Sequence, residues 1–102
     1  MITNSKKIST HFHSTEFRCK CGCGKIKIDE NLVKKVERIF SKLNASKCIV
    51  SSGYRSREYD IEMNGFAGKH SESIAVDCCF YDKFNNIIPS IIMCCAAYEL
   101  GF

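Results

Sequence analysis

The sequence shows no long apolar run, no visible secretory signal, no extended cluster of like charge and no internal repeat. No stretch approaches the roughly 20 apolar residues that a membrane-spanning helix needs, so we expect no membrane span. The first ten residues are polar and basic, which predicts a chain that is cytoplasmic as synthesised and leaves the cytosol only if lysis or another factor releases it. The net charge of +4 comes from dispersed lysines and arginines, typical of solvated faces, so we expect no nucleic-acid partner.

The length of 102 residues, with 45% apolar composition, predicts a single domain over residues 1–102. Apolar residues recur at three- and four-residue spacing after Asp29, which predicts a helix that Asp29 caps and that ends near Asn44. The only proline, Pro89, suits the first position of a last helix that ends at Gly101. In that helix we expect five residues to face inward: Ile91, Ile92, Cys95, Ala96 and Leu100. The remaining predicted elements are a helical turn at 14–17, a short strand at 25–28, a buried strand at 48–50, a helix at 57–63, a second core strand at 73–81 and a turn at 82–86.

Eight cysteines are many for so short a chain, and they pose a question of chemistry. Without an export signal, reduced thiols that act mostly as small buried apolar groups are favoured over a disulfide framework. Three cysteines lie close together at Cys19, Cys21 and Cys23. The separation of Cys19 from Cys23 suits a structural zinc site, although no second Cys/His pair has a convincing spacing. A tight turn assisted by glycine, with buried thiols, is the favoured interpretation of this segment.

A guanidinium, an imidazole and a carboxylate follow one another in the middle of the chain, at Arg55, His70 and Asp77. Two zinc ligands must bring their ligand atoms within roughly 3–4 Å of each other. On one helix, His70 and Asp77 would lie about 10.5 Å apart along the axis, so they can share an ion only if the chain turns between them. A surface ion pair or a structural hydrogen bond is the alternative interpretation of the same two residues.

These residues stand in a pattern that resembles the zinc D-alanyl-D-alanine metallopeptidases, which include bacterial D,D-carboxypeptidases and phage endolysin-type peptidases. The segment Ser52-Gly53-Tyr54-Arg55-Ser56, then Asn64-Gly65, then His70 with Ala75 and Asp77, carries the resemblance. The lead-in from Ile8 to Gly24 is similar to that of small phage-type members. The resemblance covers about residues 8–102 and is loosest after Asp77.

The resemblance implies an α+β fold of the hedgehog/D,D-peptidase type, with helices packed on a small antiparallel sheet. It implies a zinc cofactor held by His70 and Asp77, with Arg55 as the catalytic and substrate-binding arginine and Ser56 beside it as a second substrate contact. The implied reaction is hydrolysis of a peptidoglycan stem or cross-bridge peptide, in cell-wall degradation by a phage- or prophage-encoded protein. A guanidinium suits this work because it is a permanent, forked donor to a carboxylate or an oxyanion.

The sequence departs from the family pattern at Gly68 and Ser73, which replace a serine and a glycine, and beyond Phe102, where the family has a hairpin. That hairpin supplies a third ligand, a histidine, and an acidic general base. A second chain that completes the site is one possible source of these groups, and an inactive cell-wall- or partner-binding member is the alternative function. Substitute groups within this chain are few: His13, Glu72, Cys78 and Cys79.

Overall fold

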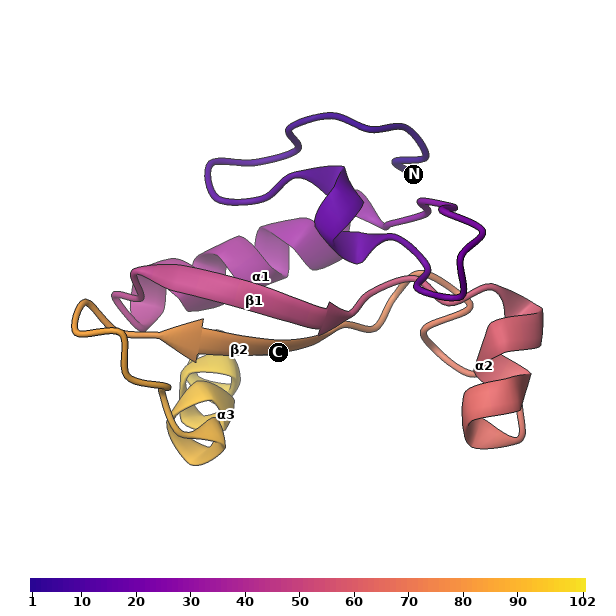
Figure 1. Cartoon of the computed structure of the whole chain (residues 1–102). Coiled ribbons are helices and arrows are strands. Elements are labelled where there is room, and N and C mark those ends of the chain that lie inside the picture. The colour runs from indigo at the N-terminus through magenta and orange to yellow at the C-terminus, as the bar shows by residue number, and fades with distance from the viewer.

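Three α-helices pack against a two-stranded antiparallel sheet in the computed structural model, which describes residues 1–102 (Figure 1). The α+β class predicted from the sequence is therefore confirmed. No helix is both long and apolar enough to span a bilayer. The elements in chain order are the 3₁₀ helix η1 (Ser14–Phe17), α1 (Glu30–Lys42), β1 (Lys47–Ser52), α2 (Arg57–Asn64), β2 (Asp77–Tyr81) and α3 (Ser90–Glu99).

Helix α1 forms where the apolar periodicity predicted it. The Asp29 side chain accepts a hydrogen bond from the backbone N–H of Asn31 at 2.7 Å, which satisfies one of the free donors at the helix start. Val33, Val36 and Phe40 are the buried residues of this helix, at the spacing of one helical face. Lys34, Lys35 and Arg38 are exposed on the other sides, so a single apolar face fixes how α1 lies on the sheet.

The sheet buries one face and leaves the other in solvent. Cys48 pairs with Phe80 and Val50 with Cys78, and these four side chains point toward α1. Ile49 points the other way and is 50% exposed, so the prediction of a wholly buried strand at 48–50 was wrong for this residue. A sheet with one uncovered face alternates inward and outward side chains, and a short apolar run does not reveal that.

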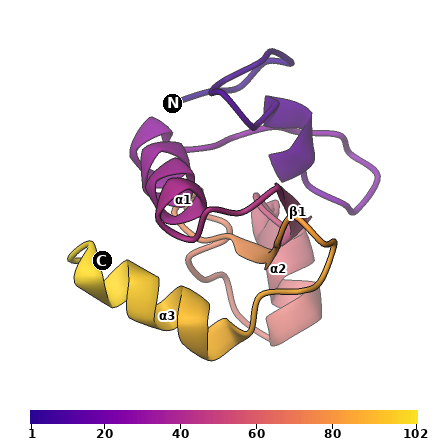
Figure 2. The ribbon, with the colours of Figure 1, turned by 90° about the vertical axis from the view of Figure 1, so that its left-hand side faces the viewer.

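The N-terminal arm, residues 1–13, covers the core on the side opposite α3 (Figures 1 and 2). Phe12 of the arm and Phe17 of η1 are almost fully buried and their rings pack tilted against one another, and Phe12 also packs edge-on against Phe40. Phe40 in turn meets Phe80 of β2 at 6.1 Å between ring centroids. The arm is tied to α1 by Glu37, whose carboxylate accepts hydrogen bonds from the Ser9 hydroxyl and the His11 ring and backbone.

Two predicted strands differ from the structure. Residues 25–28 form only an isolated bridge between Ile28 and Ile2, because no neighbouring strand lies alongside to extend the pairing. The strand predicted over 73–81 begins at Asp77, because Ser73 turns the chain in the left-handed region at φ 67°. That turn ends the loop that carries His70, so the error fell on a segment that shapes the candidate site.

Helix α3 faces the core with a different set of residues from the predicted one. Ala96 is buried as predicted and Leu100 is half-buried, but Ile91 and Ile92 are 70% and 49% exposed. Cys95 is exposed too, while Met93 packs against the core. Because α3 is apolar on nearly all sides, periodicity could not identify the face that contacts α1 and β2.

The aromatic contact between Phe40 and Phe80 yields a direct test of the core. Phe80→Ala should lower the free energy of unfolding by about 3–5 kcal/mol, since it leaves a cavity among buried rings. Phe84→Ala is the matched control, because Phe84 is 72% exposed, and it should change stability by less than about 0.5 kcal/mol. Urea unfolding of both variants measures this, and equal losses would show that the core is placed wrongly.

Candidate metal centre

Arg55, His70 and Asp77 converge at the end of the sheet where β1 ends and β2 begins. Arg55 follows β1, Asp77 is the first residue of β2, and His70 comes from the loop between α2 and β2. The His70 Nε2 atom lies 3.4 Å from Asp77 Oδ2, and an Arg55 guanidinium nitrogen lies 4.0 Å from the same oxygen. The chain therefore turns between His70 and Asp77 as a shared site requires.

A backbone carbonyl fixes the orientation of the His70 ring. The Nδ1 atom lies 2.8 Å from the carbonyl oxygen of Gly53, and a carbonyl can only accept, so Nδ1 carries the proton. In a neutral ring this leaves the lone pair of Nε2 facing the Asp77 carboxylate. Histidines that bind metals commonly donate their other ring N–H to a carbonyl or carboxylate in this way.

The separation of the two ligand atoms matches a shared ion better than a direct hydrogen bond. Two ligands about 2.05 Å from a tetrahedral zinc ion lie about 3.3 Å apart, and Nε2 and Oδ2 are 3.4 Å apart. A charge-assisted N–H···O bond would bring these atoms to about 2.7–2.9 Å. The His70 side chain is largely buried whereas that of Asp77 is 61% exposed, so an ion held there would be reached from the Asp77 side.

Arg55 is held in place by a residue that the sequence analysis did not single out, Asp60. The Asp60 carboxylate is fully buried and lies 3.3 Å from the Arg55 guanidinium. It also accepts hydrogen bonds of 2.7 Å from the Asn64 amide and from the backbone N–H of Gly68. One buried carboxylate thus links the arginine to α2 and to the start of the loop that carries His70.

The protonation of Asp60 follows from these contacts. Burial alone would raise its pKa, but the hydrogen bonds from Gly68, Arg55 and Asn64 outweigh burial and hold the pKa below its usual range. The carboxylate is therefore ionised wherever the protein is folded near neutral pH. The four-residue spacing of Asp60 and Asn64 on a helix was the signal available in the sequence, although it is too common to have identified the residue.

The backbone between β1 and α2 is fitted closely against the N-terminal part of the chain. The N–H of Tyr54 donates to the Phe17 carbonyl at 2.8 Å. A Cβ atom at Gly53 would lie 2.6 Å from the Phe17 Cα, so only glycine allows this approach. The N–H of Arg55 donates to the His70 carbonyl at 3.3 Å, which joins the two segments of the site directly.

Ser56, the predicted second substrate contact, is buried at the start of α2. Its hydroxyl accepts a hydrogen bond from the backbone N–H of Tyr59 at 3.3 Å, as an N-cap does. Its backbone N–H donates to the sulfur of Cys19 at 3.3 Å. The structure thus gives Ser56 a local structural task, and its contact with substrate stays a prediction.

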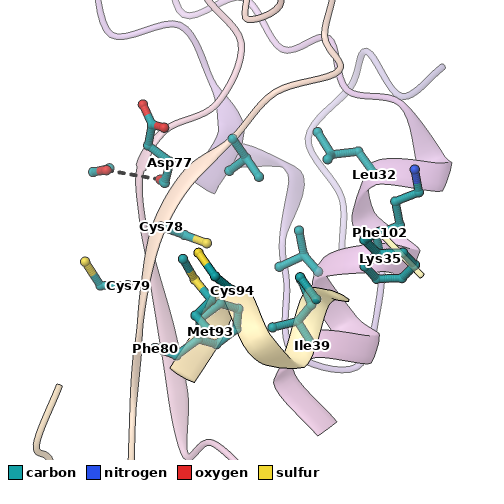
Figure 3. Close-up of a pocket in the computed structure, with 14 residues that line it drawn as sticks. Leu32, Lys35, Ile39, Asp77, Cys78, Cys79, Phe80, Met93, Cys94 and Phe102 are labelled. Atoms are coloured by element: carbon teal, nitrogen blue, oxygen red, sulfur yellow. Dashed lines mark hydrogen bonds between the residues drawn. The ribbon is translucent and has the colours of Figure 1, made fainter. Parts of the chain in front are cut away.

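The substitute groups within the chain are engaged elsewhere or lie apart from the pair. The His13 ring caps η1, and Glu72 pairs with Lys69 at 3.4 Å. Cys78 points into the core and Cys79 to the exposed face, as alternation along a strand requires (Figure 3). No third histidine, cysteine or carboxylate joins His70 and Asp77 within ligand distance.

Two cavities adjoin the site, and they differ in chemistry. A small hollow of about 100 Å³ borders Arg55 and is lined by two further cations, Arg18 and Lys20, and by two tyrosines. A larger apolar groove of about 490 Å³ runs between α1, β2 and α3 (Figure 3). Of the three site residues only Asp77 borders the groove, so the hollow beside Arg55 is the better candidate for an anionic ligand.

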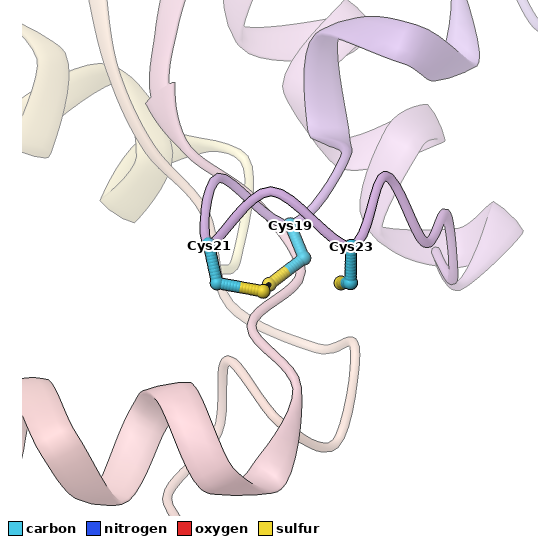
Figure 4. A group of neighbouring side chains, drawn as sticks. All are labelled: Cys19, Cys21 and Cys23. Atoms are coloured by element: carbon cyan, nitrogen blue, oxygen red, sulfur yellow. Dashed lines mark hydrogen bonds between the residues drawn. The ribbon is translucent and has the colours of Figure 1, made fainter.

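The segment that holds the three clustered cysteines forms the glycine-assisted turn that the sequence favoured, but its thiols are not all buried as predicted. All eight cysteines of the chain are free thiols. In this cluster Cys19 is buried, whereas Cys21 and Cys23 are exposed. Their sulfur atoms all lie within 4.8 Å of one another, so the cluster can bind a metal ion (Figure 4). The hydrogen bond with Cys23 lowers the pKa of Cys21 to about 7.

The burial of Asp60 predicts a specific dependence of stability on pH. Its pKa is lower in the folded chain than in the unfolded chain, so its contribution is complete above its usual pKa and disappears as pH falls through the lowered value. Asp60→Asn should lower stability at neutral pH by about 2–4 kcal/mol. It should also make the acid dependence of the free energy of unfolding shallower below about pH 4.

Glu62→Gln is the matched control for this prediction, because Glu62 is an exposed acid on the same helix. It should leave both quantities nearly unchanged. Urea unfolding at a series of pH values measures them. If Asp60→Asn kept the stability and the acid profile of the unaltered protein, the buried carboxylate would have no such role.

Comparisons with known proteins do not assign this chain to a family. No family model, no curated protein and no solved structure matches it.

Proposed function

We propose that this protein is a zinc-dependent peptidase of the D-alanyl-D-alanine type, which cleaves peptidoglycan stem or cross-bridge peptides. The observation that carries the proposal is the 3.4 Å separation of His70 Nε2 from Asp77 Oδ2, with the His70 tautomer fixed by Gly53. The proposal includes the D,D-peptidase label for the fold and a phage or prophage origin. Both rest on the sequence resemblance.

In the proposed site, His70 and Asp77 hold the metal through one nitrogen and one oxygen. Zinc accepts this ligand set, and when bound it supplies Lewis acidity toward the scissile carbonyl and lowers the pKa of a neighbouring water. The Gly53 carbonyl keeps the His70 proton on Nδ1, which leaves Nε2 free as a ligand throughout.

Arg55 has the position and the rigidity for an electrostatic role. Its guanidinium is 15% exposed and is held by Asp60, so it loses little freedom when it binds an anion. One nitrogen lies 4.0 Å from Asp77, next to where the reacting carbonyl would lie. A guanidinium fixed there can donate to the negative charge that develops on the carbonyl oxygen, or to the terminal carboxylate of the peptide.

The cationic hollow beside Arg55 supports a substrate that ends in a carboxylate. Arg18 and Lys20 line it together with Arg55, and the Lys20 ammonium also donates to the carbonyls of Val50 and Ser51. The backbone thus holds one of these charges in place. An acyl-D-alanyl-D-alanine peptide offers the matching anion at its end.

One observation favours a second candidate function. The pair has no third ligand or neighbouring carboxylate base within this chain, and a missing general base costs about 10²–10⁴-fold in rate. An inactive member that binds cell-wall peptides, or a site completed by a second chain, would have this geometry. Hydrolysis of a D-alanyl-D-alanine peptide supports the enzyme, whereas binding of the same peptide without hydrolysis supports the binding module.

Substitution of Arg55 tests the proposed role of the guanidinium. Arg55→Ala and Arg55→Lys should each abolish hydrolysis of a D-alanyl-D-alanine peptide, since neither retains the forked donor. Zinc bound at His70 and Asp77 should remain, because Arg55 is not a ligand. Arg57→Ala is the control, because Arg57 is an exposed arginine two residues away, and it should keep the activity.

His70→Ala completes this experiment, since it should remove both the activity and one equivalent of zinc measured by mass spectrometry. Hydrolysis at an unchanged rate by either Arg55 variant would refute the role of the arginine. Zinc content that does not change in His70→Ala would refute the metal site.

A further inference from the structure

The loop that holds Cys19, Cys21 and Cys23 is folded so that its three sulfur atoms meet. In an extended chain, side chains two residues apart lie about 6.6–6.8 Å from each other. Here all three sulfurs lie within 4.8 Å of one another, and those of Cys19 and Cys21 are 3.4 Å apart (Figure 4). The loop is therefore curled and not extended.

Two glycines produce this curl. Gly22 and Gly24 adopt φ values of 102° and 69°, which side chains of L-residues rarely tolerate. The backbone N–H of Cys19 then donates to the Lys25 carbonyl at 2.8 Å and closes the loop. Alternation of cysteine with glycine thus turns the cysteine side chains toward a common point.

The sulfur separations match those around a thiophilic ion. Two thiolates bound to tetrahedral zinc at about 2.3 Å lie about 3.8 Å apart. The Cys19 and Cys21 sulfurs are 3.4 Å apart, and no pair in the cluster is more than 4.8 Å apart, which is compatible with this value. Thiolates select zinc over calcium and magnesium, which prefer oxygen ligands.

A backbone donor meets the buried cysteine of the cluster. Cys19 Sγ accepts a hydrogen bond of 3.3 Å from the backbone N–H of Ser56, the N-cap of α2. Cys19 therefore lies at the N-terminus of α2, the positive end of its dipole.

We propose that Cys19, Cys21 and Cys23 bind a zinc ion as a second metal site, separate from His70 and Asp77, with one coordination position open to an exogenous ligand. Cys19 is buried against Ser56, whereas Cys21 and Cys23 are exposed, so the ion lies at the surface of the loop. It fastens the loop to the segment from Gly53 to Ser56. That segment presents Arg55 and the carbonyl that orients His70.

Cobalt(II) titration of the reduced, metal-free full-length chain tests the proposal, because a thiolate ligand gives a charge-transfer band that nitrogen and oxygen ligands do not give. With cobalt in saturating excess, the unaltered protein and His70→Ala should show the band with equal intensity. Cys21→Ser and Cys23→Ser should each weaken binding at this site by at least about 100-fold, beyond the loss caused by outer-shell changes. Cys79→Ser and Cys94→Ser are the controls, because these exposed cysteines lie outside the loop, and they should keep the band.

A second readout uses zinc and the thermal unfolding midpoint in the His70→Ala background, where the other metal site is absent. Added zinc should raise the midpoint of His70→Ala, because a ligand that binds only the folded chain stabilises it, and should not raise that of His70→Ala/Cys21→Ser. A cobalt band that survives both loop substitutions, or that disappears in Cys79→Ser or Cys94→Ser alone, would overturn the proposal. An equal rise of the unfolding midpoint with zinc in His70→Ala and in His70→Ala/Cys21→Ser would overturn it as well.

Discussion

The hydrogen bond between His70 Nδ1 and the Gly53 carbonyl is the contact on which the candidate metal centre depends. It fixes which ring nitrogen carries the proton, and it aims the other nitrogen at Asp77. Without it, the ring could rotate or change tautomer, and two neighbouring side chains would be an ordinary surface pair. The position of the Gly53 carbonyl is therefore as important to the site as the identity of the two side chains.

Several weak contacts hold that carbonyl in place. Gly53 lies against Phe17 at a distance that excludes any side chain, and the neighbouring Tyr54 N–H bonds to the Phe17 carbonyl. From the other side, Asp60 binds both Arg55 and the backbone of Gly68. The N-terminal core, α2 and the loop that carries His70 thus meet at one short segment. A change in any of them should reach the two candidate ligands through the backbone.

The sequence predicted those parts of the fold where the physical signal is local. The helix after Asp29 has a capping residue and one apolar face, and both appear in the structure. Ile49 and the inward face of α3 were mispredicted, because burial there depends on which surfaces of the sheet and helix are covered. Ser73 interrupts the predicted strand because it adopts a left-handed backbone conformation, which a serine in the sequence does not predict.

The candidate site shows the same division. Arg55, His70 and Asp77 could be chosen from their chemistry and from the family resemblance, but Asp60 and the Gly53 carbonyl act through tertiary contacts that no spacing encodes. The most direct test of the account is anomalous diffraction at the zinc absorption edge, from crystals of the zinc-loaded protein. The account predicts a peak between His70 Nε2 and Asp77 Oδ2. The absence of density there, with the two side chains in a direct hydrogen bond, would contradict it.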